Sequence, residues 1–137
     1  MTRVIADADH KVLEGVEVED TVHVVARHGD VMAAYTLNQY QAPNEMMLKV
    51  VCTKGTLLYE PALFRWSWQI DPAGEWTHIE FDPMDRDDGF VAQAAAFLDT
   101  CEGKAAPLCS LEDGWQTLKA NLAILNALEA TNWQQLN

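Results

Sequence analysis

The sequence predicts an α+β fold: a predominantly antiparallel open sheet followed by two C-terminal helices that cover one face of it. Two observations over the 137 residues lead to this prediction. Short runs rich in β-branched and aromatic residues, separated by turn signals, fill the first 81 residues. After residue 82 the apolar residues recur at helical spacing instead. Strands followed by helices are typical of α+β domains with an antiparallel sheet.

Seven runs are expected to form the strands. They are residues 2–7, 20–27, 31–41, 45–52, 56–59, 65–69 and 76–81. Gly29 and Asp30 form a tight turn signal between the second and third runs, so these two should pair as an antiparallel hairpin. Pro43 breaks the pattern before the fourth run.

Two helices are expected in the last third. An acidic stretch, residues 82–88, lies where the N-terminus of a helix favours negative charge, and Gly103 is a plausible C-cap of that first helix. Ser110 and Asp113 resemble a capping box at the start of the second helix. That helix of about five turns carries one apolar stripe, made of Leu111, Trp115, Leu118, Leu122 and Leu125.

Composition excludes several classes of partner. The net charge of −12 opposes binding to phosphate backbones and to anionic membranes, so we expect neither nucleic acid nor a membrane as a partner. No apolar run approaches the roughly 20 residues that span a bilayer. We expect a cytoplasmic protein. The odd number of cysteines without a CxxC pair fits a reducing compartment, and Cys52, Cys101 and Cys109 are interpreted as buried small hydrophobes rather than reactive thiols.

The sequence lacks the motifs of a self-sufficient enzyme. No GxGxxG or Walker A loop is present, so the chain should bind no dinucleotide alone. The four histidines are scattered without metal-ligand spacing; we expect His23 to be partly buried in a strand and His28 to be solvated in a turn. Ser67 and Ser110 have no nucleophile elbow around them. We therefore predict no catalytic, cofactor-binding or metal-binding residue.

One polar segment around a strand-to-strand turn is a candidate ligand site. It contains amide and carboxylate groups that can hydrogen-bond a hydroxyl-rich ligand, namely Gln39, Gln41, Asn44 and Glu45. The alternative is a polar hairpin end in which Asn44 and Pro43 serve only the turn.

The order of several motifs resembles a known family. The motifs are EVEDTV at residues 17–22, GD at 29–30, VVCTKGTL at 50–57, the helix from Phe90 to Leu98, and PLCSLEDG at 107–114. Together they are similar to the C-terminal domain of the glucose–fructose oxidoreductase / inositol dehydrogenase (Gfo/Idh/MocA) family. The resemblance covers nearly all of residues 1–137, which we expect to form a single domain.

The resemblance implies part of a two-domain oxidoreductase. In that family an N-terminal Rossmann domain binds NAD or NADP, whereas the C-terminal sheet helps to form the substrate cleft and the subunit interface; substrates are typically sugars, inositols and related polyols. The Rossmann domain and the family's catalytic segments are absent here, so no cofactor or catalytic residue carries over. The family's ligand-contacting turn maps onto residues 41–45.

Three functions follow as hypotheses. The first is the C-terminal, substrate-side and subunit-interface domain of an NAD(P)-dependent sugar or polyol oxidoreductase, inactive alone and present as a fragment. The alternative is a stand-alone self-associating or partner-binding module; an independent enzyme is disfavoured. We expect a homo-oligomer through the open sheet face that carries Trp66, Trp68 and Trp76, although these tryptophans are equally well explained as intramolecular core.

Overall fold

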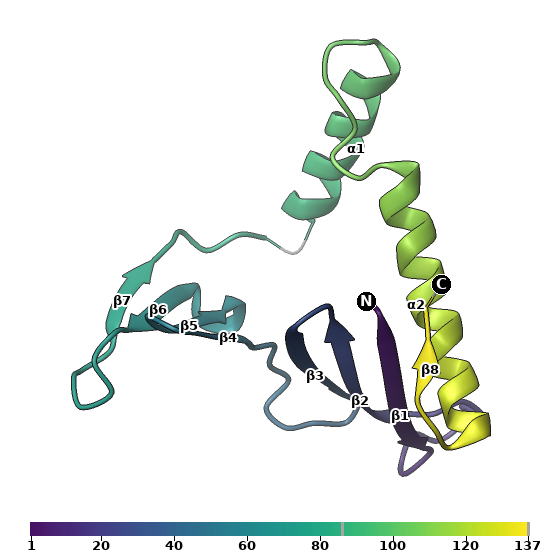
Figure 1. Cartoon of the computed structure of the whole chain (residues 1–137). Coiled ribbons are helices and arrows are strands. Elements are labelled where there is room, and N and C mark those ends of the chain that lie inside the picture. Colours follow the sequence, from purple (N-terminus) through teal and green to yellow (C-terminus); the bar gives the residue numbers. More distant parts are fainter. Residues whose placement is uncertain (86, 137) are drawn as a thin grey trace. The chain divides into compact units, whose positions relative to one another are not determined.

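The structure is a computed structural model that describes residues 1–85 and 87–136. The chain divides into two compact units, Met1–Tyr40 with Ala106–Asn137 (unit 1) and Gln41–Ala105 (unit 2). The predicted α+β class and antiparallel pairing are confirmed, with the strands divided between two four-stranded sheets (Figure 1). The expectation that residues 1–137 act as one domain stays a prediction.

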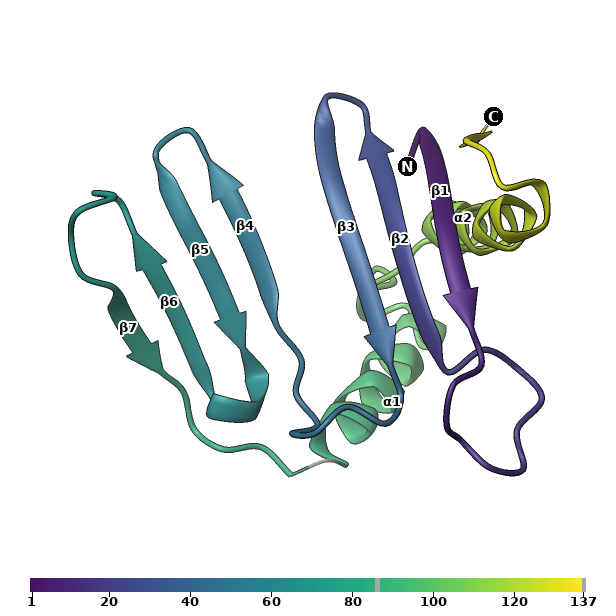
Figure 2. The same cartoon turned by 90° about the horizontal axis from the view of Figure 1, so that it is seen from below.

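Unit 1 is a four-stranded antiparallel sheet with one long helix against it. The strands are β1 (Arg3–Asp9), β2 (Thr21–His28), β3 (Val31–Asn38) and β8 (Gln134–Gln135), in the order β3-β2-β1-β8, and the helix is α2 (Leu111–Ala130). The predicted β2–β3 hairpin is confirmed, although β3 ends at Asn38 rather than at residue 41. The helix α2 packs on β1 and β8, which confirms the expected helical cover for this sheet (Figure 2).

The buried residues of α2 are both alanines, and Ile124 packs beside them. The core of unit 1 consists of Val4, Val24 and Ala26 from the sheet with Ala123 and Ala127 from the helix. Alanine lets the helix backbone approach the strands closely. The apolar stripe noted in the sequence, from Leu111 to Leu125, is exposed instead, with Leu122 at 49% and Leu125 at 54%. Helical periodicity located this stripe but could not tell which of two apolar faces packs on the sheet.

The predicted capping box at the start of α2 is confirmed. The Ser110 hydroxyl accepts a hydrogen bond from the Asp113 backbone N–H (3.1 Å), and the Asp113 carboxylate accepts one from the Ser110 N–H (3.1 Å). The Ser110 hydroxyl also donates to this carboxylate, and these bonds from Ser110 lower the pKa of Asp113. Negative charge in this first turn also suits the helix dipole.

The Ser110→Ala variant should lose about 1 kcal/mol of unfolding free energy, because the Asp113 N–H loses its acceptor. Chemical denaturation followed by circular dichroism measures the loss. The variant Ser110→Asp, which restores an N-cap acceptor, should recover most of it. A Ser110→Ala variant as stable as the wild type would show that the box contributes nothing to the folded state.

Unit 2 is a second antiparallel sheet with the order β4-β5-β6-β7. Its elements are β4 (Leu48–Cys52), β5 (Gly55–Glu60), the short 3-10 helix η1 (Pro61–Leu63), β6 (Arg65–Gln69), β7 (Thr77–Glu80) and α1 (Asp88–Cys101). The helix α1 ends as predicted: the Gly103 N–H donates to the Thr100 carbonyl (3.0 Å) and the Lys104 N–H to that of Asp99 (2.8 Å), which is a Schellman motif.

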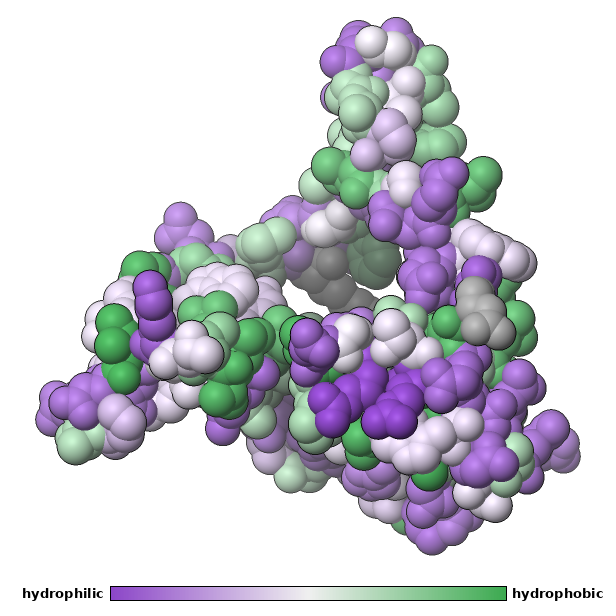
Figure 3. All heavy atoms as spheres, in the orientation of Figure 1, coloured by the Kyte–Doolittle hydropathy of each residue, from purple (hydrophilic) through white to green (hydrophobic). Residues whose placement is uncertain are grey.

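Neither face of this sheet is buried to the extent of the α2-facing side of the unit 1 sheet. Among the described residues of unit 2, Ser67 is the only fully buried one, and α1 has no buried residue. The register places one apolar set on a single face, namely Leu48, Val50, Leu57, Tyr59, Trp66, Trp68 and Ile79. Within it the rings of Tyr59 and Trp66 stack at 4.2 Å between centroids. Hydrophobic side chains lie at the surface over these strands, at the left of Figure 3.

Candidate functional site

The candidate ligand residues lie in the exposed connection between β3 and β4. Gln39 belongs to the turn that ends unit 1, whereas Gln41, Asn44 and Glu45 begin unit 2. All four side chains are exposed. The backbone of Gln39 is held, because its N–H donates to the Asp20 carbonyl at 2.9 Å.

Two of the four candidates are brought together. The Gln41 side-chain amide donates to the Glu45 carboxylate (3.4 Å) and to the Pro43 carbonyl (3.3 Å). The Ala42–Pro43 peptide bond that these contacts bracket is cis. The result is an exposed turn whose amide and carboxylate groups can exchange their mutual hydrogen bond for bonds to the hydroxyls of a ligand.

A buried carboxylate that sequence reasoning overlooked lies in unit 1. Asp20 is fully buried, and its carboxylate accepts hydrogen bonds from the backbone N–H groups of Lys11 (3.0 Å), Val12 (2.8 Å) and Leu13 (3.0 Å). Burial raises the pKa of Asp20, but these backbone bonds outweigh it and hold the pKa well below the usual range. The EVEDTV motif contains Asp20, yet its role depends on a loop that folds back onto it.

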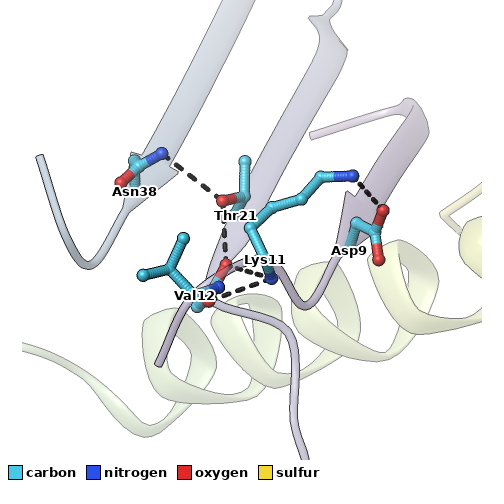
Figure 4. A network of polar contacts seen from close by, with 6 residues as sticks. Asp9, Lys11, Val12, Thr21 and Asn38 are labelled. Carbon is cyan, nitrogen blue, oxygen red and sulfur yellow. Dashed lines mark hydrogen bonds and ion pairs between the residues drawn. The ribbon is translucent and has the colours of Figure 1, made fainter. Parts of the chain in front are cut away.

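The hydrogen bonds continue from Asp20 toward the candidate segment (Figure 4). The Thr21 hydroxyl donates to the Asp20 carboxylate at 2.9 Å. The Asn38 side-chain amide donates to the Thr21 hydroxyl at 3.4 Å, and the Asn38 side-chain carbonyl accepts from the Tyr40 N–H at 3.1 Å. An ion pair between Lys11 and Asp9 lies beside this network.

Unit 2 contains a serine–histidine contact that the sequence did not suggest. Ser67 and His78 are directly opposite on β6 and β7, and the Ser67 hydroxyl lies 2.8 Å from His78 Nδ1. Because Ser67 is fully buried, its hydroxyl is closed to an incoming substrate. The contact therefore satisfies a buried polar group rather than forming a nucleophile.

Two expectations about single residues are wrong. His23 is exposed on β2 rather than partly buried, because its side chain lies on the sheet face opposite α2. Cys52, Cys101 and Cys109 are all free and exposed instead of buried. His28 is exposed as expected and contacts the Tyr35 hydroxyl at 2.9 Å. Composition indicates what a residue type prefers but not which face of an element is covered.

Shallow hollows lie on both units. In unit 1 a hollow of about 360 Å³ lies over β1, β2 and β3, where Asp7, His23 and Thr36 are cross-strand neighbours on one face. In unit 2 a hollow of about 210 Å³ lies beside Cys52 and Trp68. In the described part of the chain no group of three or more His, Cys, Asp or Glu side chains is arranged to hold a metal ion. None of its helices is both long and apolar enough to cross a membrane.

The fold is shared with solved oxidoreductase structures. An oxidoreductase domain protein from Kribbella flavida matches with a TM-score of 0.83 at 16% identity, over 99% of this chain and 44% of that one. Levoglucosan dehydrogenase in complex with NADH and levoglucosan matches with a TM-score of 0.83 at 13% identity, over 98% and 44%. The WlbA dehydrogenase from Bordetella pertussis, in complex with NADH and UDP-GlcNAcA, matches with a TM-score of 0.69 at 20% identity, over 99% and 40%.

This chain shares its fold with one part of each of these structures. The match confirms, at the level of fold, the resemblance to the C-terminal domain of the Gfo/Idh/MocA family that the sequence motifs indicate. The chain spans less than half the length of these structures. No protein-family model matches the chain, and no curated protein matches it in sequence.

Proposed function

We propose that this chain supplies the substrate side and the subunit contacts of an NAD(P)-dependent oxidoreductase that acts on sugars or polyols, and that it is not catalytic alone. The observation that carries the proposal is the fold match, which covers 98% of this chain but only 44% of a dehydrogenase in complex with NADH and levoglucosan. The sequence has no glycine-rich dinucleotide loop, so the cofactor would be held by a separate Rossmann domain.

The proposed substrate class rests on the segment from Gln39 to Glu45. Levoglucosan dehydrogenase, which shares the fold, has been solved in complexes with levoglucosan and with L-sorbose, which are both neutral and rich in hydroxyl groups. In this chain the exposed amides of Gln41 and Asn44 donate and accept hydrogen bonds, and the Glu45 carboxylate accepts them. Neutral hydroxyls are suitable partners for such groups, and they avoid the repulsion that the net charge of −12 imposes on anions.

The cofactor part of the proposal predicts that NADH and NADPH give no thermal shift with this chain. Differential scanning fluorimetry over a cofactor titration measures it. A saturable shift at sub-millimolar cofactor would contradict the proposal, because it would require a dinucleotide site within these residues.

The substrate part of the proposal is tested by a sugar titration followed by NMR. Levoglucosan should perturb the Gln41 side-chain amide in the wild type and much less in Glu45→Ala.

The interface part of the proposal rests on the exposed apolar face of unit 2. Leu48, Val50, Trp66 and Ile79 share this face and are each at least 37% exposed, and no buried apolar residue lies among the described residues of this unit. A single sheet layer needs a second layer to bury its apolar face. A second copy of the chain provides one and makes a symmetric contact.

Substitution on this face should break self-association. The variant Ile79→Lys places a charge on the proposed contact face and should shift the chain to monomers. Its matched control is Val51→Lys, because Val51 is more exposed and lies on the opposite face of the same sheet. Size-exclusion chromatography with light scattering measures the mass. A wild type that is monomeric at high concentration would eliminate self-association through this face.

The alternative, a stand-alone module that binds itself or a separate Rossmann subunit, is favoured by the exposed stripe of α2. Its residues Trp115, Leu118 and Leu122 follow a spacing of three and four that suits contact with another helix. The coding DNA upstream distinguishes the two: an in-frame Rossmann region supports one polypeptide, and a stop codon directly before Met1 supports the module.

A further inference from the structure

Asp20 holds both residues of the turn that follows β3. Its backbone carbonyl accepts the Gln39 N–H at 2.9 Å. The Tyr40 N–H donates to the Asn38 side-chain carbonyl at 3.1 Å, and Asn38 is linked to the Asp20 carboxylate through the Thr21 hydroxyl. Thr21 and Asn38 are directly opposite in the β2–β3 register, so the link crosses the ladder where the hairpin opens.

The direction of each bond follows from the charge at one end. A carboxylate only accepts, so the single hydroxyl hydrogen of Thr21 points to Asp20 and leaves the oxygen lone pairs for Asn38. The Asn38 amide nitrogen therefore faces Thr21, and its carbonyl oxygen faces the Tyr40 N–H. All three donors point the same way, toward the negative charge, and bonds aligned in this manner polarise and strengthen one another.

The same carboxylate also holds the loop after β1, through the N–H groups of Lys11, Val12 and Leu13. Burial of Asp20 keeps water away from these bonds. One side chain thus fixes two connections, and only the branch through Thr21 leads to the candidate ligand segment. A change in Thr21 separates the two branches, because the backbone donors to Asp20 remain.

We propose that Asp20 and Thr21 are positioning residues for the start of the candidate ligand segment: the Asp20 backbone carbonyl holds Gln39, and the Asp20 carboxylate and the Thr21 hydroxyl hold Tyr40 through Asn38. The ligand part of this inference rests on the proposed function. The positioning part concerns unit 1 alone and is tested without any ligand.

The experiment compares Thr21→Val with Thr21→Ser in the full chain. Valine keeps the shape and strand preference of threonine but has no hydroxyl, whereas serine keeps the hydroxyl. Amide hydrogen exchange by NMR should show the Tyr40 N–H exchanging about tenfold faster in Thr21→Val, the effect of losing one net hydrogen bond. The N–H groups of Val12 and Leu13 should stay within about twofold of the wild type. Thr21→Ser should restore the Tyr40 rate, and Asn38→Ala should reproduce the valine result.

An unchanged Tyr40 rate in Thr21→Val overturns the proposal. So does a rise that Val12 and Leu13 share equally, because it would report general loosening of the unit. A levoglucosan titration in the same samples tests the ligand part: affinity should fall in Thr21→Val and return in Thr21→Ser. If the wild type binds no sugar, the ligand part fails together with the proposed substrate contact, while the exchange rates still decide the positioning part.

Discussion

Replacing Asp20 by Ala should lower the apparent melting temperature of the chain by about 10 °C. The substitution removes the acceptor of the N–H groups of Lys11, Val12 and Leu13 and of the Thr21 hydroxyl. These four hydrogen bonds converge on one buried acceptor, so a single substitution removes all of them. The control is Asp7→Ala, which removes the same charge from an exposed position on β1. It should lower the melting temperature by only about 1–2 °C.

The same carboxylate gives a prediction about pH. The pKa of Asp20 in the folded chain lies below its value in the unfolded chain, which is about 3.9. Its contribution to stability is therefore fully present above about pH 4 and is lost as pH falls through the lowered folded value. The isosteric variant Asp20→Asn cannot titrate there, so the stability gap between it and the wild type should be constant near neutral pH and narrow below about pH 4.

Denaturation curves at neutral and acidic pH measure this gap. Asp113, whose pKa is also lowered, remains in both proteins and cancels from the difference. A gap that stays the same down to about pH 2 would show that the Asp20 charge does not stabilise the fold.

The melting experiment has its own contradicting outcome. A melting temperature of Asp20→Ala equal to that of Asp7→Ala would show that the buried carboxylate does not stabilise the loop after β1.

The Gly55→Ala variant should lose about 3 kcal/mol or more of unfolding free energy. Gly55 begins β5 with a φ of 144°, which residues with a side chain rarely adopt. A Cβ atom there would lie 2.5 Å from the Gln69 carbonyl oxygen and 3.1 Å from the Ile70 Cα. Because both obstacles are backbone atoms, the end of β6 would have to move away and weaken its pairing with β5.

The matched control is Gly29→Ala in the β2–β3 turn. Gly29 also has a positive φ, 63°, but a Cβ atom there meets nothing within 4 Å. Only the left-handed backbone is then penalised, at about 1–2 kcal/mol. Urea denaturation followed by tryptophan fluorescence measures both losses, because Trp66 and Trp68 lie in unit 2 and Trp115 and Trp133 lie in unit 1. Equal losses in the two variants would refute the close approach of β5 and β6.

Part of this fold could be predicted because it depends on interactions between residues that are close in the sequence. The capping box of Ser110 and Asp113 and the turn at Gly29 depend on residues within a few positions of one another, so a short window of sequence contains the whole interaction. The strand Arg65–Gln69 was predicted to the residue because its alternation is strict. The two-residue strand β8 is too short for periodicity and was missed.

Only one part of the candidate site and its supporting network could be predicted from the sequence. The exposed polar turn around Gln41 and Glu45 was visible from residue types and from the family resemblance. Asp20 was not, because its partners at residues 11–13 lie in a loop whose return to the carboxylate no local pattern encodes. For the same reason the EVEDTV motif at residues 17–22 indicated the family resemblance but not the structural role of Asp20.

By itself the sequence determined the α+β class, most strands, both helices and the absence of a dinucleotide loop, since each depends on spacing between near neighbours. Only the tertiary structure decided that the strands form two sheets, that alanines rather than leucines of α2 meet β1, and that Asp20 is buried. These outcomes depend on which surfaces far apart in the chain come into contact. The free energy of burying apolar surface selects one apolar face of an element over another, and the two faces have similar patterns in the sequence.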